Sequence, residues 1–76
     1  EYGTARMELR PETVTKGARV LVIDDVLATG GTASASISLI EQAGASVEAI
    51  CMLLELSDLD GRRQLQGREV DSVVIF

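Results

Sequence analysis

Several apolar runs along the chain have the character of β-strands, and one stretch has helical spacing. Residues 19–24 contain a continuous apolar run rich in β-branched side chains, which predicts a strand in the middle of a parallel sheet. Residues 47–54 are predicted to form another buried strand, and residues 70–76 a last one. Polar and apolar positions alternate over residues 6–10, which predicts a half-buried or edge strand.

The helical spacing follows the first of the buried strands. Ala33 and Ile37 belong to an apolar stripe that faces one way at 3.6 residues per turn. A helix is therefore predicted from Thr32, whose hydroxyl suits an N-cap, to Ala43. Gly44 is a natural stop for it.

The predicted order of strand, loop, helix and strand describes a right-handed βαβ unit of an α/β protein. Residues 26–32 are the predicted loop, and a short helical or loop segment over 56–66 precedes the last strand. Ligands of parallel sheets bind beyond the carboxyl ends of the strands. Residues 24–32 occupy that place and are the candidate ligand site.

Composition narrows the function classes. Twelve acidic and seven basic residues give a net charge of −5, which argues against non-specific binding to nucleic acid. With one cysteine and no histidine the chain cannot form an internal disulfide or a metal cluster, and Cys51 is expected to be a small buried hydrophobe. No apolar run approaches the roughly 20 residues of a membrane span, and no signal peptide is evident. A soluble, cytoplasmic protein is expected.

The chain is also expected to be a piece of a larger protein. Its 76 residues make one domain or less, and it opens at Glu1 without an initiator methionine. Two long apolar strands require more covering layers than a single helix supplies.

The stretch TGGT, within the predicted loop, has the chemistry of an anion site. Gly30 and Gly31 allow backbone N–H groups to converge, and the first turn of the following helix adds the positive end of its dipole. An ordinary βα turn that happens to contain two glycines remains the alternative. The lysine of a P-loop and the GxGxxG of a dinucleotide fingerprint are both missing. A single terminal phosphate monoester therefore fits the loop best.

Asp24 and Asp25 immediately precede this loop. Two carboxylates cannot both face a phosphate without strong repulsion, whereas they readily accept hydrogen bonds from vicinal hydroxyls, directly or through water on a divalent cation. Solvated turn residues are the alternative reading. A response-regulator receiver is disfavoured, because ICMLLEL offers no phosphoacceptor aspartate. Together, the acid pair and the TGGT loop predict a ligand that has ribose hydroxyls and a 5′-phosphate.

VLVIDDVLATGGT strongly resembles the phosphoribosyl-diphosphate signature of the type I phosphoribosyltransferases. EYGTARMEL, KGARVLVIDD, LLEL and VVIF extend the resemblance over nearly the whole chain, to the second half of the adenine branch of that family. The resemblance implies a Rossmann-like fold with an N-terminal hairpin or lid strand. It divides residues 1–76, the C-terminal part of one domain, into a catalytic hairpin and connector (1–18) and a nucleotide-binding core (19–76).

The family's site residues fall on definite positions here. The resemblance implies that Asp24 and Asp25 hold the ribose hydroxyls, and that Glu1 is the general acid or base for the purine. Tyr2 and Leu56 would belong to the purine pocket. The phosphate loop would consist of Ala28, which also lines that pocket, Thr29, Gly30, Gly31 and Thr32.

The implied reaction is transfer of the 5-phosphoribosyl group from phosphoribosyl diphosphate to adenine, giving AMP and diphosphate in purine salvage. Mg²⁺ is the implied cofactor, contacted by the aspartates at most through water, and the implied assembly is a homodimer that binds neither nucleic acid nor membrane. Thr4 departs from members that carry lysine there, although Arg6 lies nearby in sequence. This fragment alone should be inactive. Another purine or orotate phosphoribosyltransferase, or a non-catalytic regulator that senses phosphoribosyl diphosphate, remain alternatives.

Overall fold

The computed structural model describes residues 13–76. They form a three-stranded parallel sheet in the order β1-β2-β3, with one α-helix and two short 3-10 turns. The elements are β1 (Arg19–Leu27), α1 (Gly31–Gln42), β2 (Ser46–Glu55), η1 (Ser57–Leu59), η2 (Gly61–Leu65) and β3 (Val70–Ile75). The predicted strand over residues 6–10, and the hairpin or lid to which it belongs, lie outside the described residues.

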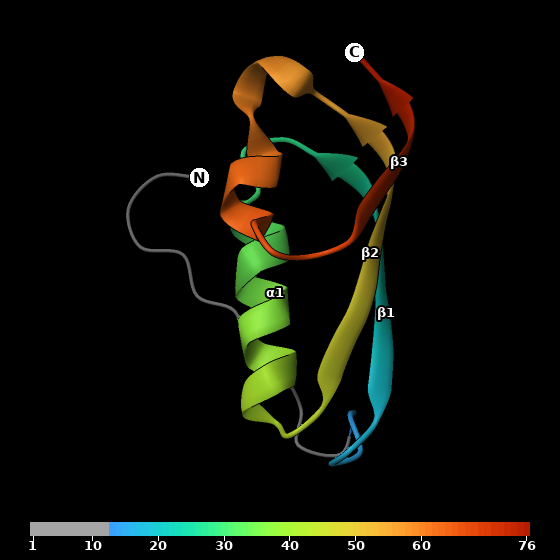
Figure 1. Ribbon diagram of the computed structural model, residues 1–76, viewed down its shortest axis with the longest axis vertical. Coiled ribbons are helices and arrows are strands. Elements are labelled where there is room, and N and C mark those ends of the chain that lie inside the picture. Colours follow the sequence, from blue (N-terminus) through green and yellow to red (C-terminus); the bar gives the residue numbers. More distant parts are fainter. Residues whose placement is uncertain (1–12) are drawn as a thin grey trace.

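The α/β architecture expected from the sequence is confirmed. β1, α1 and β2 form the parallel crossover, and the helix lies along one face of the sheet, as Figure 1 shows. The segment 56–66, predicted to be helical or loop, consists of η1 and η2, which lie near the N-terminal end of α1 (Figure 1). The three strands end at this same end of the molecule.

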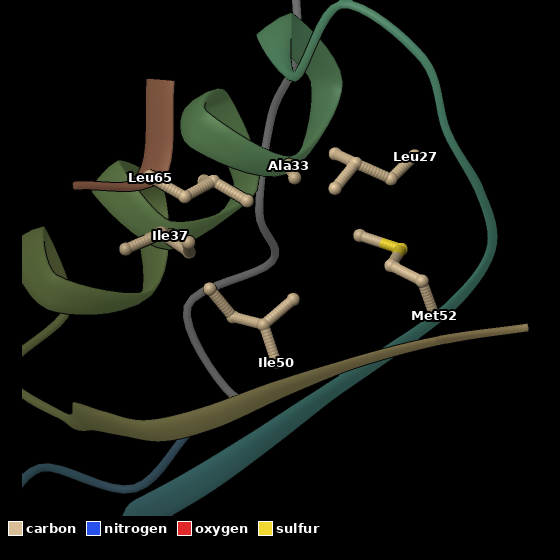
Figure 2. Close-up of a cluster of buried hydrophobic side chains, with 6 residues drawn as sticks. All are labelled: Leu27, Ala33, Ile37, Ile50, Met52 and Leu65. Atoms are coloured by element: carbon tan, nitrogen blue, oxygen red, sulfur yellow. The ribbon is translucent and has the colours of Figure 1, made fainter. Parts of the chain in front are cut away.

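A small apolar core joins the helix to the sheet. Ile50 and Met52 of β2 project toward Ala33 and Ile37 of α1, which are the two helical positions buried as the stripe predicted (Figure 2). Leu27 and Leu65 close the cluster from β1 and η2 (Figure 2). The core therefore connects the end of β1, the first half of α1 and η2.

The ends of two elements differ from the prediction. β1 continues three residues beyond Asp24, because Leu27 pairs with Glu55 of β2 and is buried in the core. α1 begins at Gly31, and its N-cap is Gly30 rather than Thr32. Gly30 has a φ of 89°, a left-handed conformation that turns the chain into the helix without a capping side chain.

The C-terminal end of α1 agrees with the prediction. Gly44 has a φ of 95° and donates its N–H to the carbonyl of Glu41 at 3.0 Å, as expected for the residue that stops a helix. Its own carbonyl accepts the N–H of Gly17 at 2.8 Å, which ties the turn before β1 to the turn after α1.

The face of the sheet opposite α1 is apolar and, within residues 13–76, uncovered. Ile23 is 71% exposed, Leu53 59% and Val73 77%. β2 and not β1 is the middle strand of the described sheet, so the expectation of a central β1 is wrong for this part of the chain. Cys51 alternates with the core residues of β2 and is half-buried rather than fully buried.

In the part of the chain that the structure describes, no helix is long and apolar enough to cross a membrane.

Candidate active site

Of the residues that the sequence singled out, those that the structure describes lie toward the carboxyl ends of the strands. Residues 24–32 run from the end of β1 through a short turn into the start of α1, and η1 and η2 follow the end of β2 at the same end of the molecule (Figure 1). This is the place where parallel α/β sheets bind ligands.

The start of α1 has the geometry of an anion site. The first intrahelical bond runs from the N–H of Ser34 to the carbonyl of Gly30 at 2.9 Å, so the N–H groups of Gly31, Thr32 and Ala33 have no partner within the helix. The first turn carries no acidic side chain to compete for the positive end of the helix dipole. These N–H groups can therefore receive an anion.

A small hollow lies beside these amides. Its volume is about 60 Å³, and residues 26–30 line it together with Thr32 and Ala33. Pockets that enclose a drug-sized ligand measure about 300–1,000 Å³. The hollow can therefore hold one small group such as a phosphate, with the rest of the ligand outside it.

Asp24 and Asp25 lie next to this hollow in the chain, and both are exposed. The Oδ1 atom of Asp24 accepts the N–H of Asp25 at 2.8 Å, and that of Asp25 accepts the N–H of Val26 at 2.8 Å. Side chains of a regular strand alternate between the two faces, so residues five positions apart should face opposite ways. Val22 and Leu27 nevertheless both pack against the core, so the alternation of β1 is broken between them. The bonds of Asp24 and Asp25 lie within this irregular stretch. Both carboxylates are therefore exposed at an irregular part of β1 that leads into the loop.

The loop is backed by η2, which sequence reasoning did not assign to the site. A Cβ placed on Gly30 would lie 2.4 Å from the carbonyl oxygen of Gly61, and one placed on Gly61 would lie 2.4 Å from the carbonyl oxygen of Ala28. Backbone therefore packs directly on backbone at both glycines. The one signal in the sequence was Gly61 itself, a glycine inside the segment 56–66 that was predicted to be helical or loop.

The predicted purine pocket is described only in part. The N–H of Leu56 donates to the carbonyl of Leu27 at 3.0 Å. Because Leu27 directly precedes Ala28, this bond places Leu56 beside the start of the loop. Both side chains are half-buried. Glu1 and Tyr2, the predicted catalytic residue and its neighbour, lie outside the described residues.

One buried carboxylate near the site was not predicted. Glu55, at the end of β2, is 5% exposed and accepts two hydrogen bonds from Nε of Arg62, at 3.0 and 2.8 Å, and one from Oγ of Ser72 at 2.7 Å. The hydrogen bond from Arg62 lowers the pKa of Glu55 below its usual value, despite the opposing effect of burial.

The described residues offer at most part of a metal site. Residues 13–76 contain no group of three or more His, Cys, Asp or Glu side chains able to hold one. Mg²⁺ commonly binds one or two carboxylates, several waters and substrate phosphates. Asp24 and Asp25, adjacent and exposed, fit this mode of binding and not a closed protein site.

Comparisons with known proteins agree with this geometry. The adenine phosphoribosyltransferase of Symbiobacterium thermophilum is 50% identical over 76 residues, which are 100% of this chain and 45% of that protein. A crystal structure of the enzyme from Thermoanaerobacter pseudethanolicus superposes with a TM-score of 0.87 at 44% identity, covering 90% of this chain and 40% of that one. The chain thus spans less than half the length of these relatives.

A third relative was solved with ligands. The adenine phosphoribosyltransferase of Trypanosoma brucei, in complex with AMP, pyrophosphate and ribose-5-phosphate, has a TM-score of 0.75 at 29% identity over 84% of this chain and 30% of its own. The family described as phosphoribosyl transferase domain matches residues 3–74. The chain therefore belongs to the phosphoribosyl transferase domain family, as its strand, acid pair and phosphate loop predicted.

Proposed function

We propose that the complete protein is an adenine phosphoribosyltransferase, which forms AMP and diphosphate from adenine and phosphoribosyl diphosphate. Residues 1–76 are one part of that catalytic domain, with a hairpin and connector at 1–18 and a nucleotide-binding core at 19–76. Relatives that carry this name match the whole chain at 50% identity. The complete enzyme acts in the cytoplasm as a homodimer in this proposal.

The phosphate loop holds the 5′-phosphate. The N–H groups of Gly31, Thr32 and Ala33 at the start of α1 have no partner within the helix, and Thr29 and Thr32, which line the hollow, can add hydroxyl donors. A monoester dianion needs several donors and little room, which agrees with the small hollow and with the lack of a P-loop lysine.

The acid pair holds the sugar. Asp24 and Asp25 accept hydrogen bonds from the ribose hydroxyls while the loop holds the phosphate at the other end, so the sugar is fixed at two points. Fixing it orients C1 of the ribose, where the bond to diphosphate breaks and the bond to the purine nitrogen forms. Mg²⁺, when bound with the substrate, neutralises charge on the leaving diphosphate.

The purine end of the reaction depends on residues at the beginning of the chain. Glu1 is the proposed general acid or base for the purine, Tyr2 and Leu56 line the purine pocket, and residues 1–10 form a lid that excludes water. In the complete protein, Glu1→Ala should lower kcat far more than it raises KM for phosphoribosyl diphosphate. Equal effects on both constants would contradict this role.

One observation supports the proposal: an exposed acid pair near the end of β1 is followed directly in the chain by a small hollow that the loop and the start of α1 line. The double variant Asp24→Asn/Asp25→Asn should raise the KM for phosphoribosyl diphosphate at least about tenfold, since a hydrogen bond to a charged group is worth about 1.5–3 kcal/mol. Binding of inorganic phosphate should change little, because the loop is intact.

Glu48→Gln provides the control. Glu48 is an exposed carboxylate near the other end of β2, bonded to Ser46, so its loss removes a charge of the same sign far from the site. Unchanged kinetics in the double aspartate variant would refute the sugar-holding role.

Assays with adenine, hypoxanthine, xanthine and orotate test which base the complete protein uses, and inactivity with adenine would refute the proposed function.

A further inference from the structure

The conformation of the phosphate loop depends on what lies behind it. Gly61 touches the loop on both sides of Thr29, through the carbonyl of Ala28 and the Cα of Gly30. Gly61 follows Asp60, which has a φ of 51°, unusual for a residue other than glycine. Because these contacts join backbone to backbone, a displacement of Gly61 cannot be absorbed by a side chain rotation and must move the loop.

Arg62, the next residue, anchors this segment to the sheet. Its Nε donates to both carboxylate oxygens of Glu55, and its Nη1 donates to the carbonyl of Val70 at 3.0 Å. Ser72 of β3 donates to the same carboxylate. The guanidinium thus connects the start of η2 to β2 and β3 by charge-assisted bonds.

The carboxylate of Glu55 is suited to this task. It is buried at the end of β2, so its position is fixed by the sheet, and the hydrogen bond from Arg62 keeps it ionised at neutral pH. The neighbouring residue Leu56 bonds to the end of β1. Glu55 thus belongs to β2, and its neighbour Leu56 joins the same strand end to the end of β1, where the loop begins.

We propose that the Glu55–Arg62 ion pair is a positioning device for the phosphate loop. By fixing Gly61 against Ala28 and Gly30, it holds the amides at the start of α1 in the arrangement that receives the phosphate. Neither side chain touches the ligand in this role. The inference rests on the proposed function insofar as the anion is the 5′-phosphate of the substrate.

A second ion pair in the chain, whose carboxylate is more exposed, serves as a control. Arg68 donates to both carboxylate oxygens of Glu41, at 2.6 and 2.9 Å, and so joins the last turn of α1 to the segment before β3. The chemistry is the same, but Glu41 lies at the opposite end of α1 from the loop. Variants of this pair report the general effect of losing an ion pair.

The experiment compares Arg62→Met, Arg62→Lys and Glu55→Gln with Arg68→Met and Glu41→Gln in the complete protein. Ribose 5-phosphate and inorganic phosphate are titrated calorimetrically, and hydrogen exchange is followed in peptides that cover residues 26–34. Arg62→Met should weaken ribose 5-phosphate binding about ten- to a hundredfold, as small misplacements of a binding group do. It should also speed exchange in the loop. Arg68→Met should do neither.

Arg62→Lys tests the same point in a milder variant, in case Arg62→Met does not fold. Lysine cannot reach the carboxylate and the carbonyl with a rigid fork, so it should restore folding and only part of the binding. KM for phosphoribosyl diphosphate should rise in the Arg62 and Glu55 variants, whereas KM for adenine should stay within about twofold.

The outcomes separate the two claims. Equal losses in the Arg62 and Arg68 variants, or unchanged loop exchange in the Arg62 variants, would overturn the positioning role even if the enzyme converts adenine. If the wild-type protein is inactive with adenine but binds phosphate, and Arg62→Met weakens that binding, the proposed function is refuted and the positioning role is supported. A wild-type protein that binds neither phosphate ligand would overturn both.

Discussion

Replacing Gly30 by alanine would test the close packing of Gly30 against the carbonyl oxygen of Gly61 in the candidate site. The new methyl group would lie 2.4 Å from the carbonyl oxygen of Gly61 and 2.9 Å from Cβ of Gln64, so backbone must shift to admit it. The left-handed conformation costs a residue with a Cβ about 1–2 kcal/mol. Overpacking costs a further 1–3 kcal/mol, so we expect the complete protein to lose about 2–5 kcal/mol of stability.

Two other glycines separate these contributions. Gly17 has a φ of 86° but no atom within 4 Å of an added Cβ, so Gly17→Ala should cost only about 1–2 kcal/mol. Gly31, inside the first turn of α1, has room for a methyl group, whose nearest neighbour would be Oγ1 of Thr29 at 3.8 Å. Because alanine is the better helix former by up to about 1 kcal/mol, Gly31→Ala should be neutral or stabilising.

Urea unfolding of the three variants, with the m-value checked for each, measures these differences. Phosphate binding should be weakened in Gly30→Ala as well, because the displaced segments form the loop. A Gly30→Ala variant no less stable than Gly17→Ala would show that Gly61 does not sit over Gly30. The account of the loop and of η2 behind it would then be wrong.

Further predictions concern the core and the pH dependence of stability. Ile50 is fully buried between sheet and helix, so Ile50→Ala should lower the free energy of unfolding by about 2–5 kcal/mol, as measured by urea unfolding. The lowered pKa of Glu55 means that its ionised carboxylate stabilises the folded state. The difference in melting temperature between wild type and Glu55→Gln should therefore be largest near pH 7, where this carboxylate is ionised. It should shrink as the pH falls below 4.5, the ordinary value, and a difference independent of pH would contradict the assignment. Glu41→Gln should show a smaller effect of the same sign, because Glu41 is exposed.

The sequence predicted the elements well where one physical signal dominated. The stripe through Ala33 and Ile37 identified the buried face of α1, and the apolar runs identified the parallel strands. The acid pair and the glycines identified one end of the sheet as the candidate site. These features depend on local spacing, which a single sequence contains in full.

The errors arose where tertiary contacts decide. Thr32 has the better capping side chain, yet the helix starts earlier because Gly30 adopts a left-handed turn against Gly61. β1 extends to Leu27 because that residue fills the core beside Met52. Nothing in the local pattern around Glu55 and Arg62 indicates that the two meet, since seven positions of irregular chain separate them.

The uncovered face of the sheet limits how the protein can be taken apart for experiments. Side chains as apolar as Ile23, Leu53 and Val73 lie exposed on neighbouring strands, and contiguous apolar surface of this kind marks a site of contact with other protein. A polypeptide cut to residues 13–76 would offer this surface to other copies of itself. We expect such a peptide to bind hydrophobic dyes and to precipitate at concentrations at which the intact protein remains dispersed.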